Sequence, residues 1–321
     1  MTGPLNTSSS DYPHFRQGLF YGFAAYAVWG LFPIYFMALM PANPLEVVVY
    51  RVIFSLLFCA VLISLTRAWP RIVATLKQPR TVLTLGIAGA LIFINWEVFI
   101  LAVYANQVVE TSLGYFINPL VTVGLGVLFY RERLRVTQWV AVGVGIVAVL
   151  VLTLGVGQIP WIALILAFSF GFYGFVKKRV GPSVKAIDGL AFESAWVTPV
   201  AIVQFIVVAN TAGVGLFDLG PWHAALMLFS GVLTAIPLML FAAGARRLPL
   251  SVIGLIQYFT PVSSFLLGIL VFHEAMPPAR WAGFALVWVA IIILTVDMLR
   301  AARKASGARN RVDVPNEPLP E

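Results

Sequence analysis

The chain has 321 residues, of which 60% are hydrophobic and only 11% are charged. Soluble domains carry about a quarter charged residues, so this composition excludes an ordinary soluble protein and predicts a chain surrounded largely by lipid. The net charge of +8 comes from short basic clusters between long apolar runs rather than from a continuous basic surface, which argues against nucleic acid as a partner.

The apolar runs predict transmembrane helices, because roughly 20 apolar residues in helical form cross a bilayer core. Continuous runs also exclude the alternating pattern of a membrane barrel. In chain order, we predict spans over residues 17–40, 45–66, 81–104, 108–130, 136–155, 159–176, 186–209, 221–243, 249–272 and 279–299. The polar or charged ends, 1–14 and 303–321, are expected to be disordered.

The basic residues predict the orientation of these ten spans, because Lys and Arg gather in cytoplasmic loops. With the N-terminus in the cytoplasm, all 21 basic residues except Arg51 and Arg280 fall in cytoplasmic segments. We therefore expect a multi-pass membrane protein with both termini cytoplasmic.

A shift of 142 residues aligns the second half of the sequence with the first. The aligned pairs include Leu113 with Leu255, Pro119 with Pro261, Glu132 with Glu274, Trp139 with Trp281, and Arg51 with Glu193. One shift that holds across four helices is not a coincidence of composition, and two successive units of five helices must lie in opposite orientations. The predicted fold class is therefore an all-α membrane protein with ten transmembrane helices in two inverted five-helix repeats, 15–155 and 156–302. Inverted repeats place a binding site near the midplane and permit alternating access.

Three charged residues lie deep inside predicted spans, where each costs roughly 2.5–3.5 kcal/mol: Arg51, Glu97 and Glu193. Arg51 and Glu97 are expected at similar depth on consecutive helices, so we predict a buried ion pair between them. Glu193 has no basic residue at its expected depth. An unpaired buried carboxyl group favours its neutral form, which makes Glu193 a candidate for proton coupling. The alternative is a neutral acid that is hydrogen-bonded to a neighbouring helix.

Polar and aromatic residues beside two prolines predict a substrate pathway. Pro119 and Pro261 interrupt their helices at matching positions and free a carbonyl one turn back, so they are candidate hinges. The residues expected to line the pathway with Glu97 are Asn95, Tyr115, Asn118, Gln257, Tyr258, Trp29, Tyr173 and Trp196. The alternative for the prolines is a kink capped by neighbouring side chains, and each aromatic ring could instead pack or face lipid.

Several segments of the sequence resemble one family. They are Ala25-Tyr26-x-x-Trp29-Gly30, Tyr50-Arg51-Val52, Asn95-Trp96, the run SLGYFINPL over residues 112–120, Arg131-Glu132-Arg133 and Gln257-Tyr258. Together they resemble the RarD group of EamA-type permeases, in the drug/metabolite transporter superfamily, over about residues 15–300. The resemblance implies an inner-membrane permease whose central cavity is lined mainly by helices 1, 3, 4, 6, 8 and 9, and it leaves the substrate open.

No motif predicts an enzyme, a cofactor or a metal site. The sequence has no Walker A loop, no histidine pair with metal-ligand spacing and a single cysteine, Cys59. We expect a secondary active or facilitative transporter, an exporter of small amphipathic or aromatic metabolites or drugs. Its expected partners are the substrate and the lipid bilayer, and it is expected to be a monomer because both halves lie in one chain. Proton-coupled uptake, a non-transporting sensor or scaffold, and lipid flipping remain as alternatives.

Overall fold

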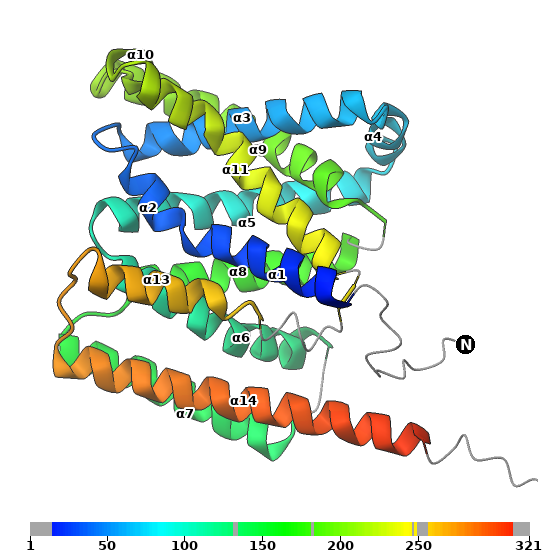
Figure 1. The fold of residues 1–321 in the computed structure, drawn as a ribbon, viewed down its shortest axis with the longest axis vertical. Coiled ribbons are helices and arrows are strands. Elements are labelled where there is room, and N and C mark those ends of the chain that lie inside the picture. Colours follow the sequence, from blue (N-terminus) through cyan, green and yellow to red (C-terminus); the bar gives the residue numbers. More distant parts are fainter. Residues whose placement is uncertain (1–14, 131–133, 181–182, 246, 249–255, 311–321) are drawn as a thin grey trace, which may run out of the picture.

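The computed structural model describes residues 15–130, 134–180, 183–245, 247–248 and 256–310 (Figure 1). Every regular element within these ranges is an α-helix. The helices are α1 (Phe15–Gly30), α2 (Phe32–Met37), α3 (Pro44–Leu65), α4 (Trp69–Leu76), α5 (Pro79–Tyr104), α6 (Val108–Tyr130), α7 (Val136–Val156), α8 (Trp161–Val180), α9 (Ala186–Thr211), α10 (Gly215–Asp218), α11 (Pro221–Ala245), α13 (Phe259–Leu270) and α14 (Pro278–Asn310).

Eight helices, with α1 and α2 counted as one, are long and apolar enough to cross a membrane. Two shorter apolar helices, over Trp161–Lys177 and Phe259–Leu270, accompany them at the sixth and ninth predicted spans. Where the structure describes both, the predicted span boundaries agree with the helix ends to within a few residues, except at the last span, predicted to end at 299, whose helix continues to Asn310. The start of the ninth span, the Arg131-Glu132-Arg133 turn and the two predicted disordered ends at 1–14 and 311–321 lie outside the described residues.

The structure corrects three details of the prediction. The first span is broken at Leu31, with Pro33 at the start of α2. Two short helices, α4 and α10, occupy segments predicted as loops. Residues 303–310, predicted to be disordered, continue α14 to Asn310, and the run Ala-Ala-Arg-Lys-Ala explains this because these residues have high helix propensity.

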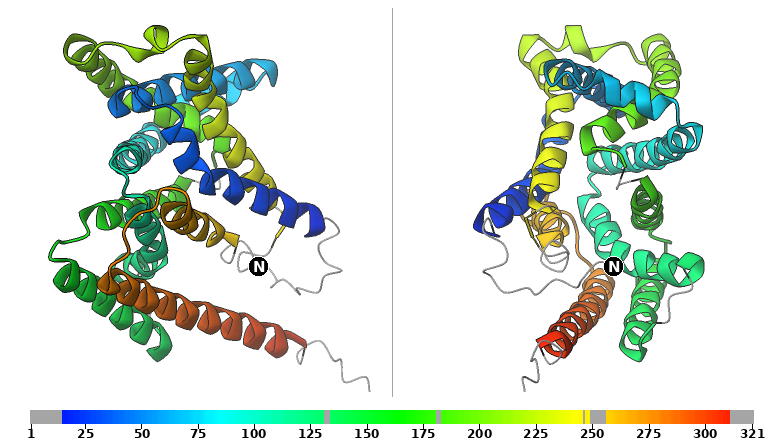
Figure 2. Two further views of the ribbon diagram at one scale, coloured as in Figure 1. Left: turned by 60° about the vertical axis from the view of Figure 1, so that its left-hand side comes forward. Right: turned by 90° about the vertical axis from the view of Figure 1, so that its right-hand side faces the viewer.

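The long helices run side by side, with α11 crossing the others obliquely (Figure 1). The start of α1, the helix α4 and the end of α14 lie at one end of the bundle, called here the terminal end (Figures 1 and 2). The helix α10 and the turn between α13 and α14 lie at the other end, called here the α10 end. This alternation is the one that the distribution of basic residues predicts.

Contacts between the helices come in matched pairs. The 142-residue shift relates α1, α3, α5, α6 and α7 to α8, α9, α11, α13 and α14, respectively. Helix α1 packs on α11 as α8 packs on α5; α3 packs on α11 as α9 packs on α5; and α6 packs on α8 as α13 packs on α1. The remaining large contacts, α3 with α9, α6 with α13 and α7 with α14, each join two counterparts. The pattern of these large contacts is thus unchanged when each helix is exchanged for its counterpart.

Two glycines related by the shift lie directly against the backbone of a neighbouring helix within these pairs. A Cβ atom on Gly231 of α11 would lie 2.3 Å from the carbonyl group of Phe54 in α3. A Cβ atom on Gly89 of α5 would lie 2.7 Å from the carbonyl oxygen of Glu193 in α9. Small residues of this kind let membrane helices pack backbone to backbone. The close approaches bring the α3 and α9 segments that carry Arg51 and Glu193 against α11 and α5.

Candidate functional site

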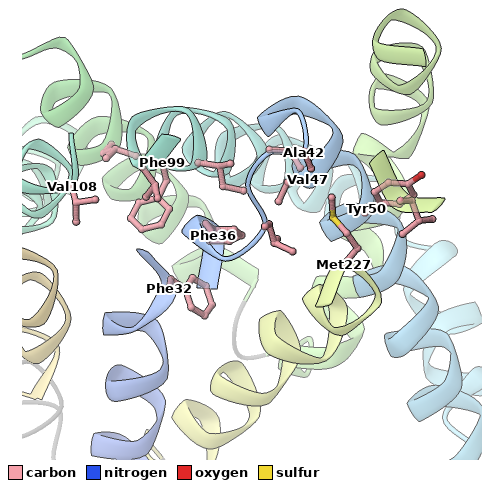
Figure 3. Close-up of a cluster of buried hydrophobic side chains, with 14 residues drawn as sticks. Phe32, Phe36, Ala42, Val47, Tyr50, Phe99, Val108 and Met227 are labelled. Carbon is pink, nitrogen blue, oxygen red and sulfur yellow. The ribbon is translucent and has the colours of Figure 1, made fainter. Parts of the chain in front are cut away.

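The break between α1 and α2 positions two aromatic rings in the interior. Leu31 closes α1 through hydrogen bonds from its N–H to Ala27 and Val28, and α2 then turns Phe32 and Phe36 into a buried cluster with Phe99 of α5 (Figure 3). The Phe36 and Phe99 ring centres are 6.0 Å apart, and Phe99 lies 6.0 Å from the ring of Tyr115. Aromatic rings therefore continue from α2 through α5 to α6.

Arg51 of α3 lies against these rings and is only 5% exposed. Its Nε donates a hydrogen bond of 3.1 Å to the hydroxyl of Thr234 in α11. The guanidinium carbon lies 4.2 Å from the ring centre of Trp96, 5.2 Å from Phe32 and 5.4 Å from Phe36. Cation–π contacts stabilise a desolvated cation by about 2 kcal/mol or more each. They lower the cost of burying the charge but do not neutralise it.

The predicted ion pair between Arg51 and Glu97 is not formed. The residue of α5 that faces Arg51 is Trp96, and the next residue along a helix is rotated by about 100° around its axis. The Glu97 carboxylate therefore points toward α9, where its Oε1 accepts a 2.6 Å hydrogen bond from Gln204. Its other oxygen, Oε2, is buried and has no hydrogen-bond partner among the described residues.

Glu193 of α9 has a basic partner, contrary to the prediction that none lies at its depth. Lys177 of α8 donates to Glu193 Oε1 at 2.5 Å, and the Tyr173 hydroxyl donates to Oε2 at 3.2 Å. The prediction was wrong because α8 continues to Val180, which places Lys177 inside the helix rather than in the following loop. Tyr173 and Lys177 are four residues apart and share a helix face, a spacing that was visible in the sequence.

A buried polar network joins α5, α6 and α8. The Asn95 amide nitrogen donates to the Leu166 carbonyl at 3.2 Å and to the Ser169 hydroxyl at 3.0 Å, and the Tyr115 hydroxyl donates to Asn95 Oδ1 at 3.0 Å. The ring of Tyr115 also contacts Phe170 of α8. The structure thus brings together two of the predicted pathway residues, Asn95 and Tyr115, and adds Ser169.

The remaining predicted pathway residues do not join this network. Trp29 packs against Tyr26 and Phe241, with ring centres at 5.1 and 6.0 Å. Asn118 accepts from Thr122 one turn along α6. Trp196 is 48% exposed and covers Gly86 on the outer face of α5.

Gln257 and Tyr258 lie in the turn that begins α13. Tyr258 lines a shallow apolar recess of about 290 Å³ that is also lined by Phe23, Ile256, Phe259 and Val262. Of the two predicted hinges, Pro119 lies inside α6 as expected. Pro261 lies in the first turn of α13 instead of mid-helix, where the missing N–H removes no helical hydrogen bond.

Carboxylates tie the two halves together at both ends of the bundle. At the α10 end, Glu46 accepts from the N–H groups of Gly215 and Leu216, at 3.0 and 3.1 Å. At the terminal end, Asp188 forms a two-bond ion pair with Arg71, at 2.9 and 3.1 Å, and this hydrogen bond raises the pKa of the arginine. The 142-residue shift relates Glu46 to Asp188, so equivalent carboxylates make equivalent ties at opposite ends.

Two further ties lie beside these. At the α10 end, Glu274 caps the start of α6 by accepting from the N–H groups of Val108 and Val109, at 2.5 and 3.0 Å. Burial raises the pKa of this carboxyl group, and the two N–H donors oppose the shift. Toward the terminal end, Arg135, which precedes α7, pairs with Asp297 of α14.

Known proteins resemble this chain over most of its length. The EamA-like transporter family matches it twice, over residues 16–154 and 159–296. A protein of Streptomyces exfoliatus named "Protein RarD" is 46% identical over 291 residues, covering 90% of this chain and 91% of that protein. "Protein RarD" of Escherichia coli K12 is 38% identical over 291 residues, covering 91% and 98% of the two chains. An "Uncharacterized transporter" of Vibrio cholerae is 39% identical over 295 residues, covering 92% and 97%.

A solved crystal structure that is 19% identical in sequence superposes with a TM-score of 0.58. The superposition covers 88% of this chain and 98% of that chain, which shows a shared fold. The two family matches also coincide with the two sets of helices that the 142-residue shift relates. The resemblance seen in the sequence is confirmed: the chain belongs to the EamA-like transporter family.

Proposed function

We propose that this protein is a secondary active or facilitative transporter that exports small amphipathic or aromatic metabolites or drugs by alternating access. The two halves, 15–155 and 156–302, would lie in opposite orientations in the inner membrane. Both termini would be cytoplasmic, and one chain would suffice for transport. The relatives that are named transporters support this class of function.

The matched helix contacts carry the proposal. Because the contact pattern is preserved when counterparts are exchanged, a second arrangement with the roles of the halves reversed would make equivalent contacts. Such a pair of mirror-related arrangements is the physical basis of alternating access. The equivalent ties of Glu46 and Asp188 at opposite ends are candidates for contacts that break in turn.

The solute would bind between α3, α5, α6, α8 and α11, where the buried Arg51 and Asn95 and the partly buried Tyr115 lie among aromatic rings. A few convergent polar groups among apolar side chains are the usual lining of a small-molecule site. Pro119 in α6 remains a proposed hinge, because it removes a backbone hydrogen bond inside a helix that borders this site.

Proton-coupled uptake is the second candidate, and the unpartnered Oε2 of Glu97 favours it. A buried carboxyl group that keeps one oxygen free can take up a proton there without breaking its bond to Gln204. Glu193 is the weaker candidate because Lys177 already neutralises it. Transport by a Glu97→Gln variant that keeps the full pH dependence of the wild type would reject proton coupling at this residue.

The test of the proposal is a flux screen in proteoliposomes. Purified protein is reconstituted, and the entry and exit of radiolabelled amino acids, aromatic acids and antibiotics are measured with and without a pH gradient. We expect saturable flux of at least one aromatic or amphipathic solute that protein-free liposomes lack. Saturable binding without any flux would overturn transport and favour a sensor or scaffold.

A further inference from the structure

Arg51 is a buried cation without an anionic partner. The guanidinium group has five N–H donors, and within the described chain its only hydrogen bond runs from Nε to the neutral hydroxyl of Thr234. None of the ion pairs formed by the described residues includes it. The donors on its two terminal nitrogens are therefore available to an anion.

The equivalent position in the other half shows how this fold neutralises such a charge internally. The 142-residue shift relates Arg51 to Glu193. In the second half, the Lys177 ammonium and the Glu193 carboxylate form an ion pair at 2.5 Å. In the first half, no acidic side chain among the described residues pairs with Arg51. Only the first half thus leaves its charge to be neutralised from outside.

The surroundings of Arg51 suit an anion that carries an apolar body. The rings of Phe32, Phe36 and Trp96 surround the guanidinium group, and the ring series continues through Phe99 to Tyr115. Trp96, which contacts Arg51, follows Asn95 in α5, and Asn95 accepts a hydrogen bond from Tyr115, so the polar network lies next to the same site. A planar carboxylate matches the two-pronged donor geometry of arginine.

We propose that Arg51 binds the carboxylate of the transported solute. The substrate class is then small carboxylic acids with an aromatic or branched apolar body, the acid group on Arg51 and the body along the rings toward Tyr115. The inference rests on the proposed transport function, because transport provides the route by which a solute reaches this buried site.

The experiment compares acids with their own neutral amides. Wild-type protein in lipid nanodiscs is titrated calorimetrically with 3-phenylpropanoate and 3-phenylpropanamide, and with 4-methylpentanoate and its amide. We expect each acid to bind at least about tenfold more tightly than its amide, because hydrogen bonds to charged groups are the strong ones. Equal affinities of acid and amide for the wild-type protein overturn the inference, and this comparison needs no variant to fold.

Variants test whether Arg51 is the cause of the preference for acids over amides. Arg51→Gln is expected to lose the preference for acids, and Arg51→Lys to keep part of it as a point charge. The matched control is Arg280→Gln, since Arg280 is an arginine at the α10 end that bonds only the Ala275 carbonyl among the described residues. A preference that survives in Arg51→Gln, or that Arg280→Gln abolishes equally, overturns the assignment.

The flux screen separates this inference from the proposed function. Saturable flux of neutral or cationic solutes, with no preference for acids over amides, would leave transport standing and overturn the carboxylate site. Binding of acids that depends on Arg51 but is never followed by flux would support the site and overturn transport. Flux of acids that Arg51→Gln abolishes supports both.

Discussion

Substitution of Gly231 by alanine tests whether α11 and α3 pack backbone to backbone. The added Cβ would lie 2.3 Å from both carbonyl atoms of Phe54 and 2.8 Å from the Ser55 nitrogen, whereas ordinary contacts begin near 3.4 Å. The two helices must therefore separate by about 1 Å, and no side chain can rotate to relieve the clash. Overpacking of this kind costs about 1–3 kcal/mol, and the better helix propensity of alanine offsets up to about 1 kcal/mol.

The unfolding assay can use the protein's own cysteine. Cys59 is a free thiol on α3 with no exposed surface, so a thiol-reactive fluorescent dye reports the unfolding of α3 on heating. We expect Gly231→Ala to melt below the wild type and Gly89→Ala, with a nearest contact of 2.7 Å, to show a smaller loss. Gly124→Ala and Gly143→Ala are the controls, because nothing lies within 4 Å of their added Cβ atoms. A Gly231→Ala protein that melts at or above the wild-type temperature would refute the packing argument.

Two further predictions concern buried carboxylates. Lys177→Met should destabilise the protein by up to about 3–5 kcal/mol, because it leaves the Glu193 carboxylate, which is 2% exposed, without its partner. Glu193→Gln should cost less, because the Lys177 side chain is 27% exposed and can reach water. The double variant should recover part of the loss, and purely additive changes in melting temperature would argue against the ion pair. For Glu274, the raised pKa means that the fold favours the neutral acid, so its contribution is complete at low pH and is lost as the pH rises through the folded pKa. The stability of the wild type relative to Glu274→Gln should therefore fall as the pH rises above about 4.5, the ordinary value for glutamate, and a rise with pH would contradict the assignment.

The spans and the helix counterparts could be predicted because both depend on local sequence. A run of apolar residues fixes a span wherever it packs, and a constant shift between matching residues survives any tertiary arrangement. Where both are described, the helix ends confirm the boundaries to within a few residues, except at the end of α14. The break at Leu31 was missed because the bilayer-length pattern over residues 17–40 is the same for a straight and a broken helix.

The partners of buried charges could not be predicted, because they depend on the rotation of each helix about its axis. The expected depth placed Arg51 beside the correct part of α5. The rotation of α5 about its axis, however, brings Trp96 rather than the next residue, Glu97, against Arg51. Helices that are apolar on every face give no signal for this rotation.

The interior glycines show the same limit. Gly145 and Gly171 meet neighbouring helices, while Gly124, Gly143 and Gly174 face open space. The presence of glycine in a helix therefore does not indicate which of its faces packs closely.

If Arg51 binds the carboxylate of a solute, then a carboxylate side chain placed beside Arg51 should compete with that solute. Thr234 offers the position, because its hydroxyl already lies 3.1 Å from Arg51 Nε and its side chain is buried. Thr234→Asp should pair with Arg51, raise the melting temperature and abolish acid binding, as Glu193 and Lys177 satisfy one another in the other half. Thr234→Asn has the same shape without the charge and should bind acids as the wild type does. Undiminished acid binding by a folded Thr234→Asp protein would show that solute and aspartate do not compete for one guanidinium group.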